Sequence, residues 1–245
     1  MVDLDPCSTR NLLLASLSRP DFERLAGQAR SISLDTGDTL YETDDAIDHV
    51  YFPESGLLSV VSDLLSGDSV ETSIVGRDGS LGFVEALGSG RIYSRVIVQV
   101  PGTAWIASAA GYREAFEASA GLRRNVNCLI ELQLAELRQN AACLSRHELR
   151  PRLARWLLEC DDRAGRPSLM PLTQEFLAAM LGTGRPSVSA TAGQLQDQGL
   201  IAYTRGSVQV HDRAGLEHAA CECRRVIQSL RQRILPESDR VFGQA

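Results

Sequence analysis

Cysteine and histidine are the residue types in this sequence that bind metals or react with oxidants. Cys143 and His147 stand four residues apart, which places them on one face of a predicted helix, and Cys221 and Cys223 stand two apart near the C-terminus. Thiolate and imidazole groups hold zinc, and thiols also sense oxidants. This spacing matches no strong metal signature, and such cysteines are more often small buried apolar residues. Our primary expectation therefore includes no metal and no cofactor, with a thiol- or metal-responsive site at these four residues as the alternative.

Motifs of enzymatic catalysis are absent from the sequence. It contains no nucleophile elbow, no phosphate-binding loop, no HExxH helix and no paired-carboxylate site. The four histidines stand apart from any such pattern, and a lone histidine is usually structural. We therefore do not expect an enzyme.

The composition is that of a globular protein, and we expect it in the cytoplasm. The 245 residues are 44% hydrophobic and 23% charged, with neither a signal peptide nor a membrane-spanning apolar run. The six scattered cysteines are expected to be reduced thiols. All 25 basic residues are arginine: residues 1–149 carry nine more acidic than basic side chains, whereas residues 150–235 carry four more basic than acidic ones. The basic C-terminal part indicates a polyanion partner.

Residues 172–195 carry the strongest local pattern. Thr173 is a suitable N-cap for a short helix, Gly182 stands where the chain must turn sharply, and Pro186 suits the first turn of a second helix. Val188 and Leu195 are spaced to bury the second helix against the first. Two short helices joined by a tight glycine turn form a helix-turn-helix. The alternative is a helical hairpin that only packs within the chain.

The second helix of such a motif enters the major groove of DNA with its N-terminal residues facing the base edges. Arg185 stands at its start, where a guanidinium can donate two hydrogen bonds to a guanine. Residues 200–203 and 207–210 form a predicted β-hairpin, the wing, with Arg205 at its tip as a phosphate contact. The predicted DNA-binding residues are Thr173, Gln174, Gly184, Arg185, Ser187, Val188, Ser189 and Arg205.

A long helix is predicted from about residue 122 to residue 147, and it carries two apolar stripes. Leucine and valine residues between positions 122 and 132 lie on one side and can cover the preceding domain. The other stripe has coiled-coil spacing and consists of Ile130, Leu134, Leu137, Ala141 and Leu144. We expect this stripe to be a dimer seam with a second copy of the chain; the alternative is that both stripes pack within one chain.

The remaining patterns complete an α+β fold. A helix over residues 11–28 with an internal restart at Ser18 precedes short β-type runs with Gly and Asp turns, which continue to about residue 106 and are typical of an antiparallel sandwich or barrel. One C-terminal helix, about 213–234, either braces the DNA-binding domain or extends the dimer contact. The predicted domains are an N-terminal antiparallel β-roll (jelly-roll-like) sensor domain in 1–118, a dimerisation helix in 119–147, a C-terminal winged helix-turn-helix domain in 148–235, and a tail in 236–245.

The whole chain resembles the Crp/Fnr regulators, the family of the catabolite activator protein. The resemblance covers the order β-roll, long helix and winged helix, and it is most specific in residues 172–201, where Gly182, Arg185 and Gly199 stand at family spacing. It implies a transcription regulator that binds a partly palindromic double-stranded DNA operator as a homodimer, with RNA polymerase as a further partner of an activator and no membrane contact. Pro186 and Ala190 replace two polar residues of the catabolite activator's recognition helix, so we expect a different half-site.

Cyclic-nucleotide sites in this family use a Gly-Glu pair for the ribose and an Arg-Ser pair for the phosphate. The corresponding positions here are Gly82-Phe83 and Tyr93-Ser94, so the carboxylate and the guanidinium are missing. Arg95 is expected to face the other side of its strand. We therefore expect an unidentified small effector rather than cyclic AMP. The predicted ligand pocket comprises Gly82, Phe83, Glu85, Tyr93, Ser94, Leu137 and Arg138.

Two other interpretations stay open from the sequence. One is a nucleotide-binding module that uses its helices for protein contacts. The other is a regulator that responds to thiol oxidation or to a metal through Cys143, His147, Cys221 and Cys223. A cluster of the iron–sulfur type is not expected, because Cys7 is the one cysteine near the N-terminus.

Overall fold

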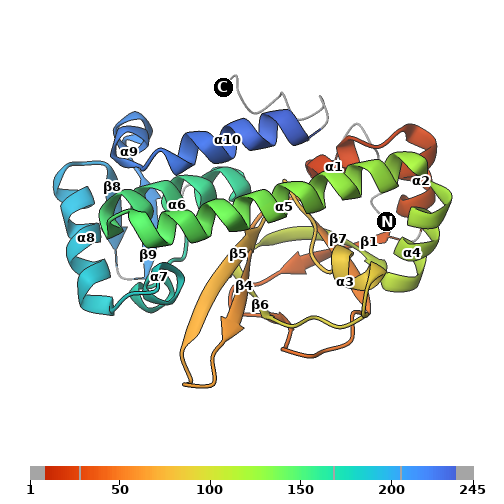
Figure 1. The fold of residues 1–245 in the computed structure, drawn as a ribbon, viewed down its shortest axis with the longest axis horizontal. Helices are drawn as coiled ribbons and strands as arrows, with labels where there is room; N and C mark the ends of the chain where they lie inside the picture. Colours follow the sequence, from red (N-terminus) through yellow and green to blue (C-terminus); the bar gives the residue numbers. More distant parts are fainter. Residues whose placement is uncertain (1–8, 28, 168, 205, 236–245) are drawn as a thin grey trace.

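The computed structural model describes residues 9–27, 29–167, 169–204 and 206–235. Figure 1 shows a long central helix with a β-structure beneath it and a second, mainly helical domain at one of its ends. The N-terminal helices lie at the opposite end. The chain therefore has the α+β architecture predicted from its sequence, with β domain, long helix and helix-turn-helix in the predicted order.

Two short helices, α1 (Leu12–Ala15) and α2 (Arg19–Ala26), precede the β-structure. The Asn11 side chain caps α1 by accepting a hydrogen bond from the backbone N–H of Leu14. Ser18 caps α2 in the same way, with a proline in its first turn. The predicted restart of the helix at Ser18 is therefore confirmed.

The β-roll pairs its strands in antiparallel sheets. One sheet has the strand order β1–β7–β3 and the other has the order β2–β6–β4–β5. Because β7 pairs with both β1 and β3, the last strand of the roll holds its beginning and middle together. The strands are β1 (Ala29–Leu34), β2 (Thr39–Tyr41), β3 (His49–Pro53), β4 (Leu57–Asp63), β5 (Ser69–Val75), β6 (Arg95–Val100) and β7 (Gly102–Ser108).

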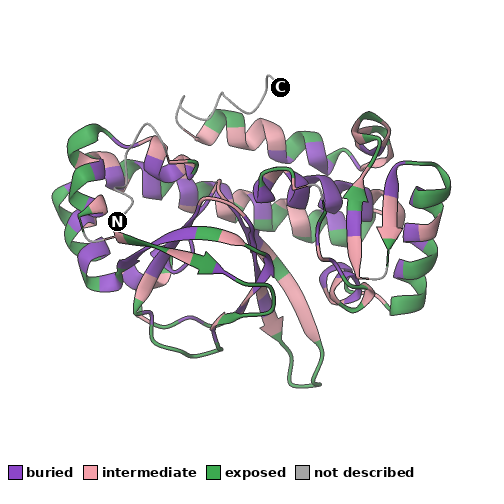
Figure 2. Cartoon of the chain, turned by 180° about the vertical axis from the view of Figure 1, so that it is seen from behind, coloured by how far each residue is buried: buried purple, intermediate pink, exposed green. Residues whose placement is uncertain are grey.

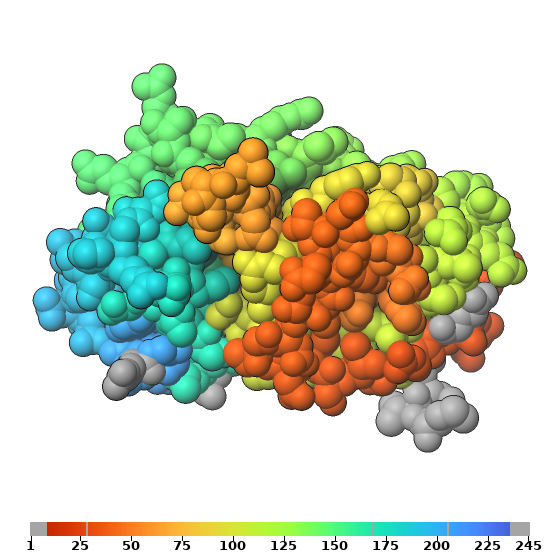
Figure 3. All heavy atoms as spheres, turned by 90° about the horizontal axis from the view of Figure 1, so that it is seen from below, coloured from red at the N-terminus to blue at the C-terminus, as the bar shows by residue number. Residues whose placement is uncertain are grey.

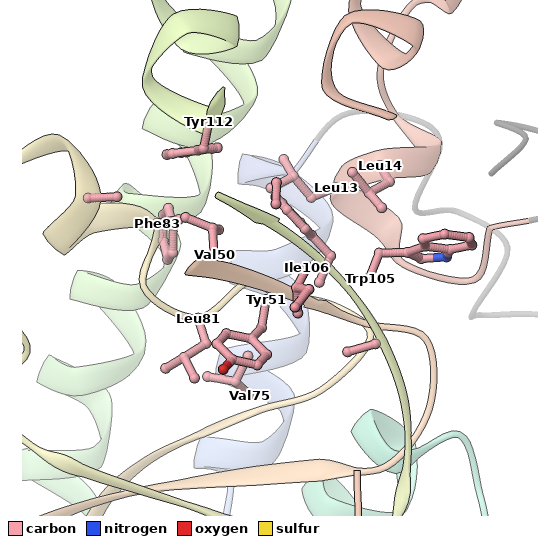
Figure 4. Close-up of a cluster of buried hydrophobic side chains, with 14 of the residues drawn as sticks. Leu13, Leu14, Val50, Tyr51, Val75, Leu81, Phe83, Trp105, Ile106 and Tyr112 are labelled. Atoms are coloured by element: carbon pink, nitrogen blue, oxygen red, sulfur yellow. The ribbon is translucent and has the colours of Figure 1, made fainter. Parts of the chain in front are cut away.

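Apolar side chains of the sheets and of the adjacent helices form the core of the β-roll. Figure 4 shows Leu14 of α1, Val50 and Ile106 of the strands, and Tyr112 converging there. Val50 and Tyr112 are completely buried. Burying a large apolar side chain contributes about 1.5–3 kcal/mol, so this core fixes the position of every helix that enters it.

Helices α3 (Phe83–Leu87), α4 (Ala109–Ala118) and α5 (Ala120–Arg146) follow within and after the roll. Ser119 ends α4 and caps α5, accepting a hydrogen bond from the backbone N–H of Leu122. The predicted stripe of α5 that covers the β-roll is confirmed. Leu122, Val126 and Leu129 belong to the core of the β-roll, and Leu132 is buried as well.

The C-terminal domain has a second core, which also takes in Leu57, Ile74 and Val100 of the β-roll. The domain is therefore packed directly against the roll. Its elements are α6 (Leu149–Ala164), α7 (Gln174–Leu181), α8 (Arg185–Asp197), β8 (Ile201–Thr204), β9 (Ser207–Val210), α9 (Arg213–Ala219) and α10 (Cys223–Ile234).

The C-terminal helix differs from the single helix expected over residues 213–234. The chain leaves helical geometry at Ala220, which has an extended backbone (φ −74°, ψ 151°), and re-enters it at Cys223. The backbone N–H of Cys221 donates a hydrogen bond to the carbonyl of Pro151 (3.2 Å), so a contact with the start of α6 holds the break. After the break, α10 runs alongside α5 (Figure 1).

Candidate nucleic-acid interface

The helix-turn-helix is built as its sequence predicts. Thr173 caps α7 by accepting a hydrogen bond from the backbone N–H of Phe176 (3.1 Å). Gly182 ends α7 in the left-handed region (φ 60°), which suits glycine because it has no Cβ, and Pro186 lies in the first turn of α8. The two helices therefore meet across a tight turn, and Figure 2 shows the outer side of α8 exposed.

The polar residues at the start of α8 lie on its exposed side. Arg185, Ser187 and Ser189 are exposed, and Gln174 of α7 donates a hydrogen bond to the Ser189 hydroxyl (3.1 Å). The Arg185 guanidinium lies 2.5 Å from a carboxylate oxygen of Glu175, a pairing that sequence analysis did not foresee. Because both partners are more than half exposed, water and salt screen this pair.

Two other predicted contacts, Val188 and Gly184, have different positions from the exposed polar residues of α8. The Val188 side chain is completely buried against the second core, so it fixes α8 on α7 rather than facing a base edge. Gly184 is the N-cap residue of α8. Arg205 lies outside the described residues, between paired strands β8 and β9, which form the predicted wing.

The second stripe of α5 is apolar and open to solvent. The side chains of Leu134, Leu137 and Leu144 are 44–50% exposed, and Ala141 is exposed as well. Ile130 is half-buried and packs partly on the core of the β-roll. A row of large apolar side chains on one helix face is the arrangement that a coiled-coil contact requires.

Four charged side chains from four parts of the chain meet where α5, α6 and α10 cross, and we call Asp78, Glu136, Arg163 and Arg231 the junction cluster. Arg163 of α6 lies 2.7 Å from Glu136 of α5 and 3.3 Å from Asp78, which follows β5. Arg231 of α10 pairs with the same two carboxylates. The cluster therefore joins the β-roll, the long helix, the DNA-binding domain and the C-terminal helix.

Burial and charge act in opposite directions on the acids of the junction cluster. Burial raises the pKa of Asp78 and of Glu136, but the guanidinium groups of Arg163 and Arg231 outweigh it and hold both pKa values below their usual range. Both acids are therefore ionised at neutral pH, and each faces two cations. Sequence analysis missed this cluster because its four members lie up to 153 positions apart.

A second polar contact joins the DNA-binding domain to the β-roll. The indole N–H of Trp156 in α6 donates a hydrogen bond to Glu71 of β5 (3.0 Å). Burial raises the pKa of Glu71 to about 8, although the hydrogen bonds from Ser59 and Trp156 oppose this. In Figure 3 the β4–β5 hairpin stands beside the DNA-binding domain, and β5 is in contact with α7.

A cavity of about 430 Å³ lies between the β-roll, α5 and α6. Most of the predicted ligand pocket lines it, namely Gly82, Phe83, Glu85, Ser94 and Leu137. Tyr93 and Arg138 are exposed and stand outside that lining. Burial raises the pKa of Glu85, the acid of this lining that comes from α3.

The cations that line the cavity come from α6 rather than from the β-roll. They are Arg152, Arg155 and Arg163, and the last two are held by carboxylates. Arg95 of β6 does not line the cavity and forms two hydrogen bonds with Asp63 of the neighbouring strand β4. The roll's side of the cavity therefore lacks the guanidinium that a cyclic phosphate requires.

The structure also brings together the cysteine and histidine residues singled out in the sequence. The ligand atoms of Cys143, His147, Cys221 and Cys223 all lie within 4.8 Å of one another. The three thiols are buried, and they form a cluster separate from both apolar cores. Cys160, by contrast, belongs to the second core.

Comparison with protein-family models identifies two domains in the chain. Residues 31–119 match the cyclic nucleotide-binding domain, and residues 151–219 match the Crp-like helix-turn-helix domain. No curated protein sequence matches the chain significantly. In the part of the chain that the structure describes, no helix is long and apolar enough to cross a membrane.

Several solved structures have a similar fold. FixK2 from Bradyrhizobium japonicum is 19% identical, with a TM-score of 0.66, over 79% of this chain and 98% of its own. A putative Crp/Fnr-family regulator from Eubacterium rectale is 18% identical, with a TM-score of 0.64, over 84% and 96%. A CRP-family transcriptional regulator from Thermus thermophilus is 25% identical, with a TM-score of 0.62, over 77% and 96%.

Proposed function

Because this chain belongs to the Crp/Fnr family of transcription regulators, we propose that it binds a partly palindromic DNA operator as a homodimer and that a small effector controls it. The observation that carries the proposal is the division of α8 into two faces. Val188 and Leu195 bury one face of α8 in the second core. Arg185, Ser187 and Ser189 lie on the other face, which is exposed and can enter a groove of DNA.

Each predicted DNA contact has a distinct role in this proposal. Arg185 donates two hydrogen bonds to a guanine, and Ser187 and Ser189 donate to a phosphate or a base edge. Gly184 lets the DNA backbone approach the N-terminal end of α8, whose helix dipole attracts a phosphate. Thr173 and Gln174 lie beside the start of α8 and position the motif on the DNA backbone. Arg205, expected from the sequence at the tip of the wing, is a candidate phosphate contact.

The exposed stripe of α5 supports the homodimer. Pairing Leu134, Leu137 and Leu144 with the same residues of a second copy removes them from water. The two copies of α8 would then enter major grooves about one helical turn, roughly 34 Å, apart. RNA polymerase is a further partner if the regulator is an activator.

The cavity between the β-roll, α5 and α6 is the proposed effector site. A ligand there touches the sensor domain, the dimer helix and the DNA-binding domain, so it can favour one arrangement of these parts over another. We do not expect cyclic AMP, because the β-roll offers neither a guanidinium for the phosphate nor the expected carboxylate for the ribose.

Selection of genomic DNA fragments with the purified protein tests the DNA-binding proposal. We expect a two-fold symmetric motif with a guanine in each half-site and a steep loss of affinity as salt rises. Arg185→Ala should remove the preference for that guanine. Arg24→Ala removes the same charge from an exposed position of α2, and it should leave the preference unchanged. Selection of the same unrelated fragments by the wild-type protein and by Arg185→Ala would contradict the proposal.

Sedimentation measurements test the homodimer. Leu137→Glu places a charge in the middle of the exposed stripe and should convert a dimer into a monomer. Leu65→Glu is the matched control, since Leu65 is completely exposed at the β4–β5 turn. A dimer that persists in Leu137→Glu would place the subunit contact elsewhere.

A further inference from the structure

Four side chains with metal-binding atoms converge at the end of the long helix. Cys143 lies in the last turn of α5, and His147 is the residue that ends this helix. Cys221 and Cys223 come from the break between α9 and α10, 74 or more positions further along the chain. We call these four residues the thiol–imidazole cluster.

Two of the distances within this cluster match the edges of a tetrahedral site. The Sγ atoms of Cys143 and Cys221 lie 3.6 Å apart, and Cys223 Sγ lies 3.5 Å from His147 Nδ1. In a tetrahedron with Zn–S bonds of about 2.3 Å and a Zn–N bond of about 2.0 Å, sulfur–sulfur edges are about 3.8 Å and sulfur–nitrogen edges about 3.5 Å. Two edges already have this length, and since all four ligand atoms lie within 4.8 Å of one another, only small shifts of the side chains are needed to bind one ion.

A neighbouring carboxylate supports the same interpretation. His147 directs Nδ1 at the thiols, and its Nε2 lies 3.2 Å from a carboxylate oxygen of Glu222. Metal-binding histidines usually donate their other ring N–H to a carboxylate or carbonyl, which fixes the ring and strengthens the ligand. The side-chain amide of Gln139 also donates a hydrogen bond to Cys223 Sγ (3.0 Å), as it would to a bound thiolate.

Two simpler accounts explain less of this arrangement. The cysteines are separate from both apolar cores, so they do not fill space in either. A disulfide between Cys143 and Cys221 would need the two sulfur atoms to close from 3.6 Å to about 2.05 Å, and it would use neither Cys223 nor His147.

We propose that Cys143, His147, Cys221 and Cys223 bind one Zn²⁺ ion per chain. Three thiolates and an imidazole form a soft, tetrahedral donor set, which selects zinc over oxygen-seeking cations such as magnesium and calcium. Each thiol releases a proton on binding. All four coordination positions come from the protein, so the site is structural and leaves no position for a substrate.

The place of this site gives it a consequence for the regulator, which rests on the proposed function. His147 stands between α5 and α6, where the DNA-binding domain joins the long helix. An ion there ties α10 to this hinge, in addition to the ion pairs that Arg231 makes in the junction cluster, and its loss would loosen the hinge. Binding and loss of zinc would therefore shift the orientation of α8.

Metal analysis of the full-length protein, prepared without an affinity tag, tests the site itself. We expect one zinc per chain, and an X-ray absorption spectrum with three sulfur neighbours and one nitrogen neighbour. After chelation, Co²⁺ should restore one site per chain with the intense visible absorption of tetrahedral cobalt thiolates. A first shell of oxygen, or a metal-free protein that does not take up Co²⁺, would overturn the proposal.

Variants assign the site to these residues. Cys221→Ser should abolish the cobalt spectrum, whereas Cys128→Ser, which removes a half-buried thiol of α5 outside the cluster, should leave it unchanged. Glu222→Gln should weaken metal affinity about 10- to 100-fold without unfolding the chain, because Glu222 is exposed. Metal bound at full affinity in both Cys221→Ser and Glu222→Gln would place the site elsewhere. Since these readouts do not involve DNA, their failure leaves the proposed function standing.

Discussion

The junction cluster and the outer face of α8 use arginine in opposite ways. Arg163 and Arg231 at the junction are largely buried, and each pairs with two carboxylates. Arg185 on α8 is 62% exposed and pairs with one exposed acid. Buried charges are costly to separate, whereas exposed pairs contribute little. The junction therefore holds the domains in one arrangement, while the guanidinium that would meet DNA is free to change partners.

The largest expected effect comes from breaking the junction cluster. Arg163→Met leaves Glu136 and Asp78 with a single compensating cation, and it should lower the free energy of unfolding by about 3–5 kcal/mol. Denaturant unfolding measures this change. Arg91→Met is the matched control, because Arg91 pairs with Asp44 at the surface. This variant should lose less than about 1 kcal/mol of its free energy of unfolding. Equal losses in both variants would remove the distinction between the two regions.

Arg185→Lys tests the exposed region while conserving its charge. Lysine lacks the fork that donates two hydrogen bonds to a guanine, so discrimination between operator and altered operator should fall by about 1–3 kcal/mol. Competition binding with both DNAs measures this effect. The salt dependence of binding and the free energy of unfolding should stay unchanged; a loss of stability would show that Arg185 has a structural role like that of Arg163.

The pH dependence of stability tests the contact that Glu71 makes between the β-roll and α6. Its pKa is raised by burial to about 8 in the folded chain, above the value of an unfolded glutamate. Its protonated form thus favours the folded state at low pH, and this contribution is lost as pH rises towards 8. From pH 6 to pH 7 the wild-type protein should lose up to about 1.4 kcal/mol of stability relative to Glu71→Gln. Parallel stability curves for the two proteins would show that Glu71 is not perturbed.

The smallest expected effect concerns the acid beside Arg185. Glu175→Gln releases the guanidinium, and because exposed ion pairs contribute at most about 1 kcal/mol, DNA affinity should rise no more than severalfold. The gain should appear at low salt and vanish at high salt. Binding curves at two salt concentrations measure this gain. A fall in DNA affinity would mean that Glu175 itself contacts the DNA.

The elements that could be predicted from the sequence depend on local signals. Ser18 and Thr173 act as helix caps where they were expected, and Gly182 makes the turn of the helix-turn-helix. The stripe of α5 that packs on the β-roll was also predicted, because helical spacing alone places its residues on one side. Each of these features is set by residues that lie close to one another in the sequence, so the sequence pattern alone predicts it.

Features that depend on distant contacts were not predictable in the same way. The break at Ala220 has no proline or glycine to mark it, and it is held by the carbonyl of Pro151. The junction cluster joins residues as far apart as Asp78 and Arg231, which no local pattern relates. The cysteine pairs were visible in the sequence, but the turn that brings Cys221 to Cys143 was not.

The hydrogen bond between Trp156 and Glu71 has a practical consequence. Of the two tryptophans in the chain, Trp105 lies within the β-roll and Trp156 lies where α6 meets it. Movement of the DNA-binding domain away from the roll would break the indole's hydrogen bond and admit water, which shifts tryptophan emission to longer wavelengths. With Trp105 replaced by phenylalanine, the protein would carry its own fluorescent reporter of the position of α6, readable while effector, zinc or DNA is added.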